Sequence, residues 1–409
     1  MSLIRPFPAL RPAAGRAADV IAPPYDVMNG DEARRLADGR PWSFLHISRP
    51  EIDLPPGTNP YAPEVYAKAA DNLRSMREAG VLVQDPGPCY YAYRLVMGDH
   101  SQIGLVASAS VAEYDRNRIR KHEFTRPDKE DDRVRQIEAV DAQTGPVLLA
   151  HPDAPEVERL LAAVAQAEPD ADAWSESGVR HTLWVIRSAE TIAELTRYFE
   201  AMPALYIADG HHRAAAASRV SASRAATLRA DAPHASFLAV IFPGRQMRIL
   251  DYNRLIRDTH GFDEASLLRR IAEDFAIEDV GEPCRPVAPG QFGMYLGGRW
   301  RRLTVRPERI PADPVGSLDV SLLQDLLLGP VLGIGDPRRD QRIDFVGGIR
   351  GLAELQRRVD SGEMAVAFAL YPTGMTQLMA VADAGEVMPP KSTWFEPKLA
   401  DGMASQLLV

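Results

Sequence analysis

The residues from Asp209 to Arg213, in the order Asp-Gly-His-His-Arg, form the densest set of groups that could do chemistry. An apolar run from Ala204 to Ala208 precedes them and an alanine-rich stretch follows, which predicts a strand, a tight turn at Gly210 and a helix from about His212. A helix start offers unpaired N–H groups and the positive end of the helix dipole, so the pattern predicts a phosphate or other anion site. Two alternatives stay open: Asp209 only caps the helix, or the histidines belong to a metal site.

A charged stretch at residues 121–133, KHEFTRPDKEDDR, is the second candidate. Pro127 suits the first position of a helix, which places Thr125 and Arg126 at the helix start. Lys129 and Arg133 are four residues apart and share one helix face. Arginine and lysine can hold phosphates here and carboxylates can hold magnesium. The alternative is a solvated helix with surface ion pairs.

Two proline-bearing segments near the N-terminus could position further groups. In APPYDV, residues 22–27, the double proline predicts a rigid turn that presents Asp26 as a general base. In FLHISRPE, residues 44–51, alternating exposure predicts a strand end that carries His46, Ser48 and Arg49, with Arg49 placed to grip a carboxylate. The alternatives are a turn with an Asx cap for the first segment, and core or surface packing for the second.

The motif MPPKSTWFEPK, residues 388–398, brings Lys391, Ser392 and Thr393 into a proline-stiffened loop that could contact phosphate. It does not match the P-loop pattern, and a strap anchored by Trp394 and Phe395 is the alternative. The chain has no nucleophile elbow, no H-E-x-x-H and no G-x-G-x-x-G, which disfavours serine hydrolases, zincins and dinucleotide-binding enzymes.

Composition excludes other classes. The 409 residues predict two to three domains, and the net charge of −9 disfavours a general nucleic-acid binder. The sequence contains no apolar run long enough for a transmembrane helix. Proline and arginine interrupt the start where a secretory signal needs an apolar core, so we expect a cytoplasmic location. The two cysteines exclude a disulfide scaffold. Many of the 33 prolines, such as Pro23, Pro24, Pro127, Pro389 and Pro390, fall inside the motifs, where fixed φ angles would hold charged loops in place.

Hydrophobic patterning predicts elements along the whole chain. We expect helices over residues 61–79, 156–168, 190–200, 264–274, 319–328 and 350–359. We expect strands at 181–187, 236–243 and 364–370, a hairpin over 89–110 and a strand pair over 292–306. Helices and strands alternate without a strict repeat, so the predicted class is mixed α/β. The predicted regions are 1–150, 151–260 and 261–409.

Seven separated motifs, in this order, resemble the large prokaryotic family catalogued as domain of unknown function 1015. They are IRPFPALRP, VIAPPYDV, SFLHISRPE, HEFTRPDKEDDR, YIADGHHRAAAA, LDVSLLQDLLLGPVLGI and MPPKSTWFEPK. The DGHHR box is also similar to the box of SerK-type free-serine kinases in the ParB/sulfiredoxin superfamily. That resemblance implies a ParB/sulfiredoxin-like core around the strand–box–helix unit, with additional α/β segments. Sulfiredoxin chemistry fits poorly, because His211 stands where that group has its cysteine.

The resemblance implies a kinase that transfers a phosphoryl group from ATP or ADP, with Mg²⁺, to the hydroxyl of free L-serine. In this hypothesis the phosphates are held by Gly210, His211, His212, Arg213, Thr125, Arg126, Lys129, Arg133, Lys391, Ser392 and Thr393. Asp209 or Glu130 holds the metal, Asp26 or Glu123 is the base, Asp209 is also a catalytic candidate, and His46, Ser48 and Arg49 bind the acceptor.

The expected partners are a nucleotide and an amino acid, with no nucleic acid and no membrane. Two other functions stay open: a ParB-type nucleotide switch without turnover, and a phosphatase or lyase acting on a phosphorylated metabolite.

Overall fold

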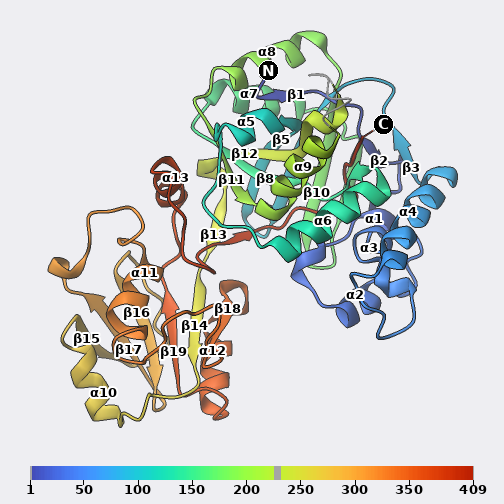
Figure 1. The fold of residues 1–409 in the computed structure, drawn as a ribbon. Coiled ribbons are helices and arrows are strands. Elements are labelled where there is room, and N and C mark those ends of the chain that lie inside the picture. Colours follow the sequence, from blue (N-terminus) through green and yellow to red (C-terminus); the bar gives the residue numbers. More distant parts are fainter. Residues whose placement is uncertain (1, 225–231, 409) are drawn as a thin grey trace. The chain divides into compact units, whose positions relative to one another are not determined.

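The computed structural model describes residues 2–224 and 232–408 (Figure 1). The chain divides into two compact units, one of Met1–Met247 with Pro397–Val409 and one of Arg248–Glu396. This division corrects the three predicted regions, because a boundary after residue 150 would cut strand β8 (Val147–His151) in the middle of a sheet. The last residues belong to the first unit because β21 (Gln406–Leu407) pairs with β7 (Ala142–Gln143).

A mixed sheet forms the centre of the first unit, in the order β6-β11-β8-β12-β5-β4-β10-β9, with β1 beside β5. The pairs β6–β11 and β8–β12 are parallel, whereas β4 and β5 form the antiparallel hairpin predicted around Gly98. Every residue of β12 is buried, so both faces of the sheet are covered at its centre. The strands are β1 (Ile4–Arg5), β4 (Tyr90–Met97), β5 (His100–Ser110), β6 (Ile119–Arg120), β8, β9 (Ala171–Trp174), β10 (Val179–Ile186), β11 (Leu205–Asp209) and β12 (Ser236–Pro243). A smaller ribbon pairs β2 (Leu10–Pro12) with β3 (Leu82–Gln84).

Helix α9 (His211–Ser223) packs closely because its inward side chains are small. Ala214, Ala216 and Ala217 are at most 1% exposed. Ala216 and Val220 form a small apolar cluster with Ile137 of helix α6 (Pro127–Val140) and with Leu408. Leu408 belongs to residues 397–408, which we call the C-terminal segment. This packing holds the starts of α6 and α9 and the C-terminal segment in one neighbourhood. The other helices of this unit are α1 (Ala17–Val20), η1 (Tyr25–Val27), α2 (Gly30–Ala37), α3 (Leu45–Ser48), η2 (Pro50–Asp53), α4 (Pro63–Glu78), α5 (Val111–Asp115), α7 (Pro155–Val164), α8 (Ala189–Glu200), η4 (Pro233–Ala235) and η5 (Gly244–Gln246).

Residues 44–51 differ from the prediction, because they form the helical turns α3 and η2 rather than a strand end. Phe44, Leu45, Ile47 and Ser48 are all buried, at spacings of one, three and four residues. Over so few residues that pattern is easily mistaken for the alternation of a strand, although it is the period of one helical turn. The other predicted helices and strands are present with small shifts at their ends, which confirms the mixed α/β class.

The second unit contains a sheet in the order β15-β17-β16-β19-β14-β18 and a ribbon of β13 with β20. Its hydrophobic cluster joins sheet residues such as Leu255 and Ala367 with Leu355 of helix α12. Its strands are β13 (Arg248–Leu250), β14 (Tyr252–Ile256), β15 (Phe275–Val280), β16 (Gln291–Leu296), β17 (Arg299–Val305), β18 (Ile343–Gly347), β19 (Val366–Leu370) and β20 (Trp394–Glu396). Its helices are α10 (Glu264–Ile271), η6 (Pro307–Arg309), α11 (Asp319–Leu323), the π-helical turn η7 (Gln324–Leu328), η8 (Gly348–Arg350), α12 (Gly351–Asp360) and α13 (Met375–Asp383).

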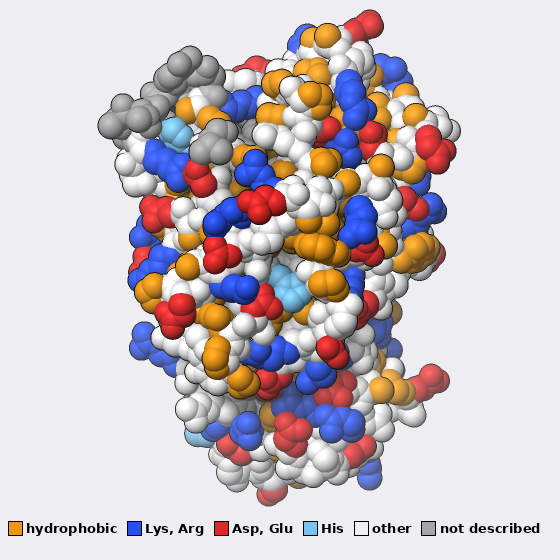
Figure 2. Space-filling view, turned by 90° about the vertical axis from the view of Figure 1, so that its right-hand side faces the viewer, with side chains coloured by type: hydrophobic (Ala, Val, Ile, Leu, Met, Phe, Trp, Pro, Cys, Tyr) orange, Lys and Arg blue, Asp and Glu red, His pale blue; other side chains and the backbone are white. Residues whose placement is uncertain are grey.

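On the face shown in Figure 2, basic and acidic side chains are interspersed, and no large patch of one sign is visible. Within the described residues, no helix combines the length and the apolar character needed to span a membrane.

Candidate active site

The turn between β11 and α9 has the predicted strand–glycine–helix form, and it requires glycine. Gly210 has a φ of +95°, which L side chains rarely adopt, and it is the N-cap of α9. A Cβ atom there would lie 3.0 Å from Arg213 Nε and 3.3 Å from Val147 Cα. Asp209 therefore ends the strand rather than capping the helix, which corrects one of the alternatives from the sequence. The first-turn N–H groups of α9 have no intrahelical acceptors and point beyond the helix start.

Arg213 folds back over this turn and is the most buried cation of the box, with its side chain 10% exposed. Its Nη1 donates to the Pro146 carbonyl, and its Nη2 lies 3.7 Å from Asp26 Oδ2 and 3.8 Å from Asp209 Oδ1. Its buried Nε has no hydrogen-bond partner. Burial alone would lower the pKa of the guanidinium, but the surrounding carboxylates outweigh burial and raise it. Arg213 is thus a permanent buried charge that its own neighbours satisfy only in part.

Asp209 is the ionised carboxylate of the turn, and its side chain is 36% exposed. Lys398 Nζ, from the C-terminal segment, lies 3.4 Å from its Oδ2. Burial raises the pKa of this carboxyl, but Lys398 and Arg213 together reverse the shift and lower the pKa to about 2. The carboxylate therefore keeps its negative charge throughout the physiological range.

The two box histidines have a different role from the predicted one. His211 Nε2 accepts the backbone N–H of His122 at 3.4 Å, and His212 Nε2 accepts the backbone N–H of Arg126 at 3.0 Å. Burial lowers the pKa of both rings, so they are neutral at physiological pH and these nitrogens carry no proton. Their side chains therefore tie the 122–126 loop to the helix start. What remains for an anion is the backbone and Arg213.

Most of the predicted charged residues at the start of α6 contact other protein groups. The helix begins at Pro127 with Arg126 as N-cap, as predicted. Thr125 donates to Glu130, which also lies 3.3 Å from Arg219 Nη1. Arg126 pairs with Asp128 at 2.8 Å, and Lys129 donates to the Tyr61 hydroxyl at 2.9 Å. These ion pairs match the alternative of a solvated, ion-paired helix face for this part of the segment.

Arg133 is the exception, because its side chain turns inward. Its guanidinium carbon lies 3.8 Å from the centre of the Tyr25 ring. Its Nε and Nη2 donate to Asp132 Oδ2 at 3.0 and 2.7 Å, while Asp132 Oδ1 accepts from the Tyr66 hydroxyl. The ring stack and the paired hydrogen bonds fix the guanidinium in one orientation.

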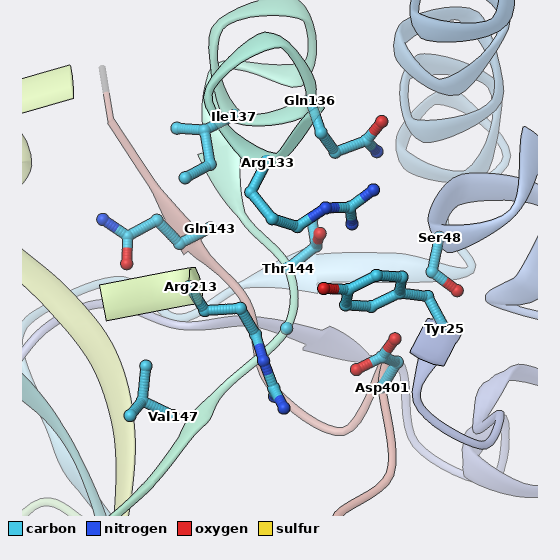
Figure 3. A pocket seen from close by; sticks show the side chains of 11 residues that line it. Tyr25, Ser48, Arg133, Gln136, Ile137, Gln143, Thr144, Val147, Arg213 and Asp401 are labelled. Carbon is cyan, nitrogen blue, oxygen red and sulfur yellow. The ribbon is translucent and has the colours of Figure 1, made fainter. Parts of the chain in front are cut away.

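A buried polar cavity of about 30 Å³ lies between these elements (Figure 3). It has room for about two water-sized groups. It is lined by Tyr25, Ser48, Arg133, Gln136, Ile137, Gln143, Thr144, Gly145, Val147, Arg213 and Asp401. The proline turn, the 44–51 segment, α6, the DGHHR box and the C-terminal segment each contribute a side chain. Motifs that are far apart in the sequence therefore converge on one cavity.

Asp401 is the buried carboxyl of this cavity, at 2% exposure, and the sequence did not single it out. Burial raises the pKa of Asp401 to about 7, and the opposing effect of Arg213 does not cancel that shift. Lys398, the partner of Asp209, was also not predicted as a site residue. The signal that could have found both is a charged pair, three residues apart, in an otherwise apolar C-terminal segment.

The three predicted acceptor-binding residues fall into two groups. His46 contacts Asp53 at 2.7 Å, and Arg49 donates to Glu51 at 2.7 Å and to the carbonyls of Tyr25 and Met28. Arg49 is therefore engaged with its own protein, which corrects its predicted grip on a carboxylate, and it positions Tyr25 instead. Only Ser48 lines the cavity.

The remaining predictions concern bases, metals and the second unit. Asp26 is 40% exposed beside Arg213, whereas Glu123 is 54% exposed, 3.8 Å from His211 Nδ1. Lys391 to Thr393 lie in the second unit, where Ser392 donates to the Pro389 carbonyl, and their phosphate contact stays a prediction. Among the described residues, no group of three or more His, Cys, Asp or Glu side chains could hold a metal ion.

The sequence of this chain matches one protein family, and its fold matches several solved structures. The model of a family described as "Protein of unknown function (DUF1015)" matches residues 4–321. No curated protein is a significant match.

Three solved structures illustrate the structural matches. A conserved hypothetical protein from Pyrococcus furiosus matches at 13% identity and a TM-score of 0.36, over 74% of this chain and 95% of that one. SbnI from Staphylococcus aureus, with a C-terminal truncation, matches at 12% and 0.37, over 74% and 87%. A free serine kinase variant in complex with AMP matches at 12% and 0.35, over 71% and 87%. Likenesses at these TM-scores assign no activity to this chain.

Proposed function

Since the chain belongs to the family of unknown function DUF1015, whose model covers most of its length, we propose an activity from its own residues and from the resemblance of its box. The proposed activity is a nucleotide-dependent kinase that phosphorylates the hydroxyl of a small molecule, with free L-serine as the acceptor. The observation that carries the proposal is the start of α9. There an ionised Asp209, a buried Arg213 with an unpartnered Nε, and free first-turn N–H groups share one turn.

Phosphoryl transfer depends on positioning and on neutralising charge more than on covalent chemistry of the protein. The backbone at Gly210 and the Arg213 guanidinium supply fixed positive potential for the nucleotide phosphates. The neutral His211 and His212 rings keep the 122–126 loop at the same helix start, since each accepts one of its N–H groups. The loop and the helix start therefore form one rigid phosphate cradle in this proposal.

In the reaction, the serine hydroxyl oxygen forms a bond to the terminal phosphorus of ATP or ADP. The bond from that phosphorus to the bridging oxygen breaks, and ADP or AMP leaves. Asp26, 3.7 Å from Arg213 Nη2 and partly exposed, accepts the hydroxyl proton. Arg213 thus lies between the base and the phosphates in this proposal.

Mg²⁺ is the metal that such a reaction uses, and it typically binds one or two carboxylates together with phosphate oxygens. Asp209 fits that role, because it stays ionised and its side chain is 36% exposed. Glu130 fits less well, because its two oxygens already contact Thr125 and Arg219. The bound ion would neutralise phosphate charge.

The test is to incubate the purified protein with ATP, ADP or CTP, with Mg²⁺ and L-serine, and to detect O-phosphoserine by mass spectrometry. We expect phosphoserine with one of the nucleotides and none without a nucleotide. Nucleotide-dependent dimerisation without phosphoserine would replace the proposal with a nucleotide switch. Release of free phosphate from a phosphorylated metabolite, with no nucleotide requirement, would replace it with a hydrolase.

A matched pair of variants on α9 tests the cradle itself. We expect Arg213→Ala to weaken nucleotide binding at least about tenfold in calorimetry, as the loss of a charged hydrogen-bond donor implies. Arg219→Ala removes an exposed arginine of the same helix and should leave nucleotide affinity unchanged. Equal affinities in both variants would remove Arg213 from the phosphate site. Arg213→Lys gives the same comparison with the charge retained.

A further inference from the structure

We propose that the base of the bound nucleotide stacks on the side chain of Phe124. This inference rests on the proposed function and deepens it, since it adds the base to a site that would hold the phosphates. It also gives the 121–133 motif a role in ligand binding that most of its charged side chains do not have, because they pair with other protein groups.

Phe124 is the most exposed large hydrophobic side chain among the residues that the structure describes, at 75%. Its neighbours in the sequence are polar or charged, with Glu123 before it and Thr125 after it. A single exposed apolar side chain is common on protein surfaces and needs no explanation by itself. The place of this one in the fold is what points to a ligand.

The loop that carries Phe124 leaves the sheet at the same edge as the DGHHR turn. Strands β6 and β11 are parallel neighbours, with Ile119 opposite Leu205. The loop follows the carboxyl end of β6, and the turn follows the carboxyl end of β11. In α/β sheets, ligands commonly bind outside the carboxyl ends of the strands. The fold therefore brings Phe124 to the edge where the phosphates would bind.

The loop is fixed on both sides of Phe124. The backbone N–H of His122 donates to His211 Nε2, and the two rings pack edge-to-face with their centres 4.4 Å apart. The backbone N–H of Arg126 donates to His212 Nε2. Phe124 is two residues from each anchor, so its Cα lies within about 7 Å of the Cα of either one. The backbone that carries the ring is thus held beside the start of α9 before a ligand arrives, which lowers the entropic cost of binding.

The same helix start contains an unsatisfied charged donor. Arg213 is 9% exposed, and its buried Nε has no hydrogen-bond partner among the described residues. This Nε would lie 3.0 Å from a Cβ at Gly210, so it adjoins the turn. A buried cation and an exposed aromatic ring at one helix start suit a ligand with an anionic end and a flat aromatic end. Nucleotides have both ends, whereas inorganic phosphate and phosphorylated amino acids such as phosphoserine lack the second.

Stacking on an aromatic side chain is open to every nucleobase, because each base has a π face. A purine has two fused rings and a pyrimidine has one, so the larger overlap favours adenine over cytosine. The ring of Phe124 would therefore make ATP or ADP bind more tightly than CTP, although it makes no hydrogen bond to the base.

The experiment measures binding of ADP and of inorganic pyrophosphate to the full-length protein by calorimetry, with Mg²⁺ present. We expect Phe124→Ala to weaken ADP binding about tenfold or more, the effect of losing one stack between a base and an aromatic side chain. Pyrophosphate has no base, so its affinity should not change in this variant. Arg213→Ala should weaken the binding of both ligands. Unchanged ADP affinity in Phe124→Ala, or an equal loss for pyrophosphate, would overturn the inference.

Three further variants separate stacking from other effects. Phe124→Tyr keeps the ring and should bind ADP like the wild type. Phe124→Leu keeps an apolar side chain without a π face and should lose ADP affinity, and wild-type affinity in this variant would refute stacking. Trp174→Ala is the matched control, because Trp174 is 61% exposed on β9, at the opposite edge of the sheet from β6. It should leave ADP affinity unchanged.

The outcomes separate this inference from the proposed function. ADP binding that depends on Phe124, without phosphoserine formation, would support the inference and refute the kinase. Phosphoserine formation with a KM for the nucleotide that Phe124→Ala does not change would support the kinase and refute the inference.

Discussion

The β11–α9 turn and the C-terminal segment each bring one carboxyl group toward Arg213, yet the two groups titrate in opposite directions. Asp209, in the turn, has its pKa lowered to about 2 by Lys398 and Arg213 against the effect of burial. Asp401, in the C-terminal segment, has its pKa raised to about 7, because burial exceeds the effect of Arg213. Asp209 remains partly exposed, whereas Asp401 is almost fully enclosed.

The difference shows that one guanidinium does not balance two carboxyls. The second cation, Lys398, lies beside Asp209, whereas Asp401 shares Arg213 with Asp26 and Asp209. Pairs of carboxyls whose surroundings push their pKa values apart commonly have separate roles in enzymes. The permanent negative charge of Asp209 suits a metal ion that binds phosphates, whereas the carboxyl of Asp401 can take up or release a proton near neutral pH.

The largest effect is expected from Asp401→Asn, measured as stability. The folded carboxyl holds its proton more tightly than the unfolded one, whose pKa is near 3.8, so stability falls as pH rises from about 4 to 7. Removing the charge should raise the free energy of unfolding at pH 8 by up to about 4 kcal/mol. The gain should shrink toward zero near pH 4.

Urea titrations of wild type and variant at pH 5 and pH 8 check this prediction. Asp131→Asn serves as the exposed control and should change stability little at either pH. An equal gain for Asp401→Asn at both pH values would contradict the raised pKa and with it the contrast between the two carboxyls.

The next effect concerns Asp209→Asn, which removes the permanent charge but not the shape. We expect phosphoserine formation to fall by about 100-fold or more, in the range found when one preorganised charged or polar group is removed from a transition state. The pKa of Asp401 should stay raised, since burial is its main cause and Asp209 does not line the cavity. Rates from mass spectrometry and an NMR titration of the Asp401 carboxyl separate the two. A pKa of Asp401 that returns to its ordinary value would show that the two carboxyls act as one unit.

A smaller effect is expected from Gly210→Ala. The positive φ costs about 1–2 kcal/mol for any L side chain, and the new Cβ also displaces Arg213. Gly15→Ala is the matched control, because its φ is +77° and no atom lies within 4 Å of the added Cβ. Both variants should lose stability in thermal unfolding, and Gly210→Ala should lose more, because only its Cβ meets other atoms. Only Gly210→Ala should weaken nucleotide binding, and equal nucleotide affinity in the two variants would separate Arg213 from the turn.

The smallest effect is expected from Lys398→Met, which takes away one of the cations that lower the pKa of Asp209. The pKa of Asp209 should rise, which an NMR titration of its side-chain carboxyl measures directly. Lys398→Arg keeps the charge and should leave that pKa unchanged. An unchanged pKa in Lys398→Met would show that Arg213 alone keeps Asp209 ionised.

The sequence predicted the local part of the site well, because its signals are local. A buried strand, a glycine and an alanine-rich stretch are sufficient for the β11–α9 turn, and Pro127 marks the start of α6 through its fixed φ. The predictions that failed depend on contacts between segments that are far apart in the sequence. The histidines act as acceptors only because the 122–126 loop lies against them. Arg49 is engaged because the proline turn offers it two carbonyls.

The inward side of α6 could not be predicted for a related reason. Asp132 and Arg133 look like two more charges of a solvated helix, and only Tyr25 and Tyr66, from other segments, make them an interior pair. Asp401 was missed because its one local signal, a charge three residues after Lys398 in an apolar segment, does not show that the carboxyl is buried. Burial of a charge is a property of the assembled fold, and the local pattern does not contain it.

The return of residues 397–408 to the first unit has a consequence for biosynthesis. The second unit, Arg248–Glu396, is inserted in the sequence between the main part of the first unit and this segment. Lys398 and Asp401 therefore leave the ribosome only after both sheets have been translated. A nascent chain can complete its central sheet early but cannot carry the charges of the site until synthesis reaches this segment. A product that terminates before it would keep Arg213 beside Asp209 but would lack both Lys398 and Asp401.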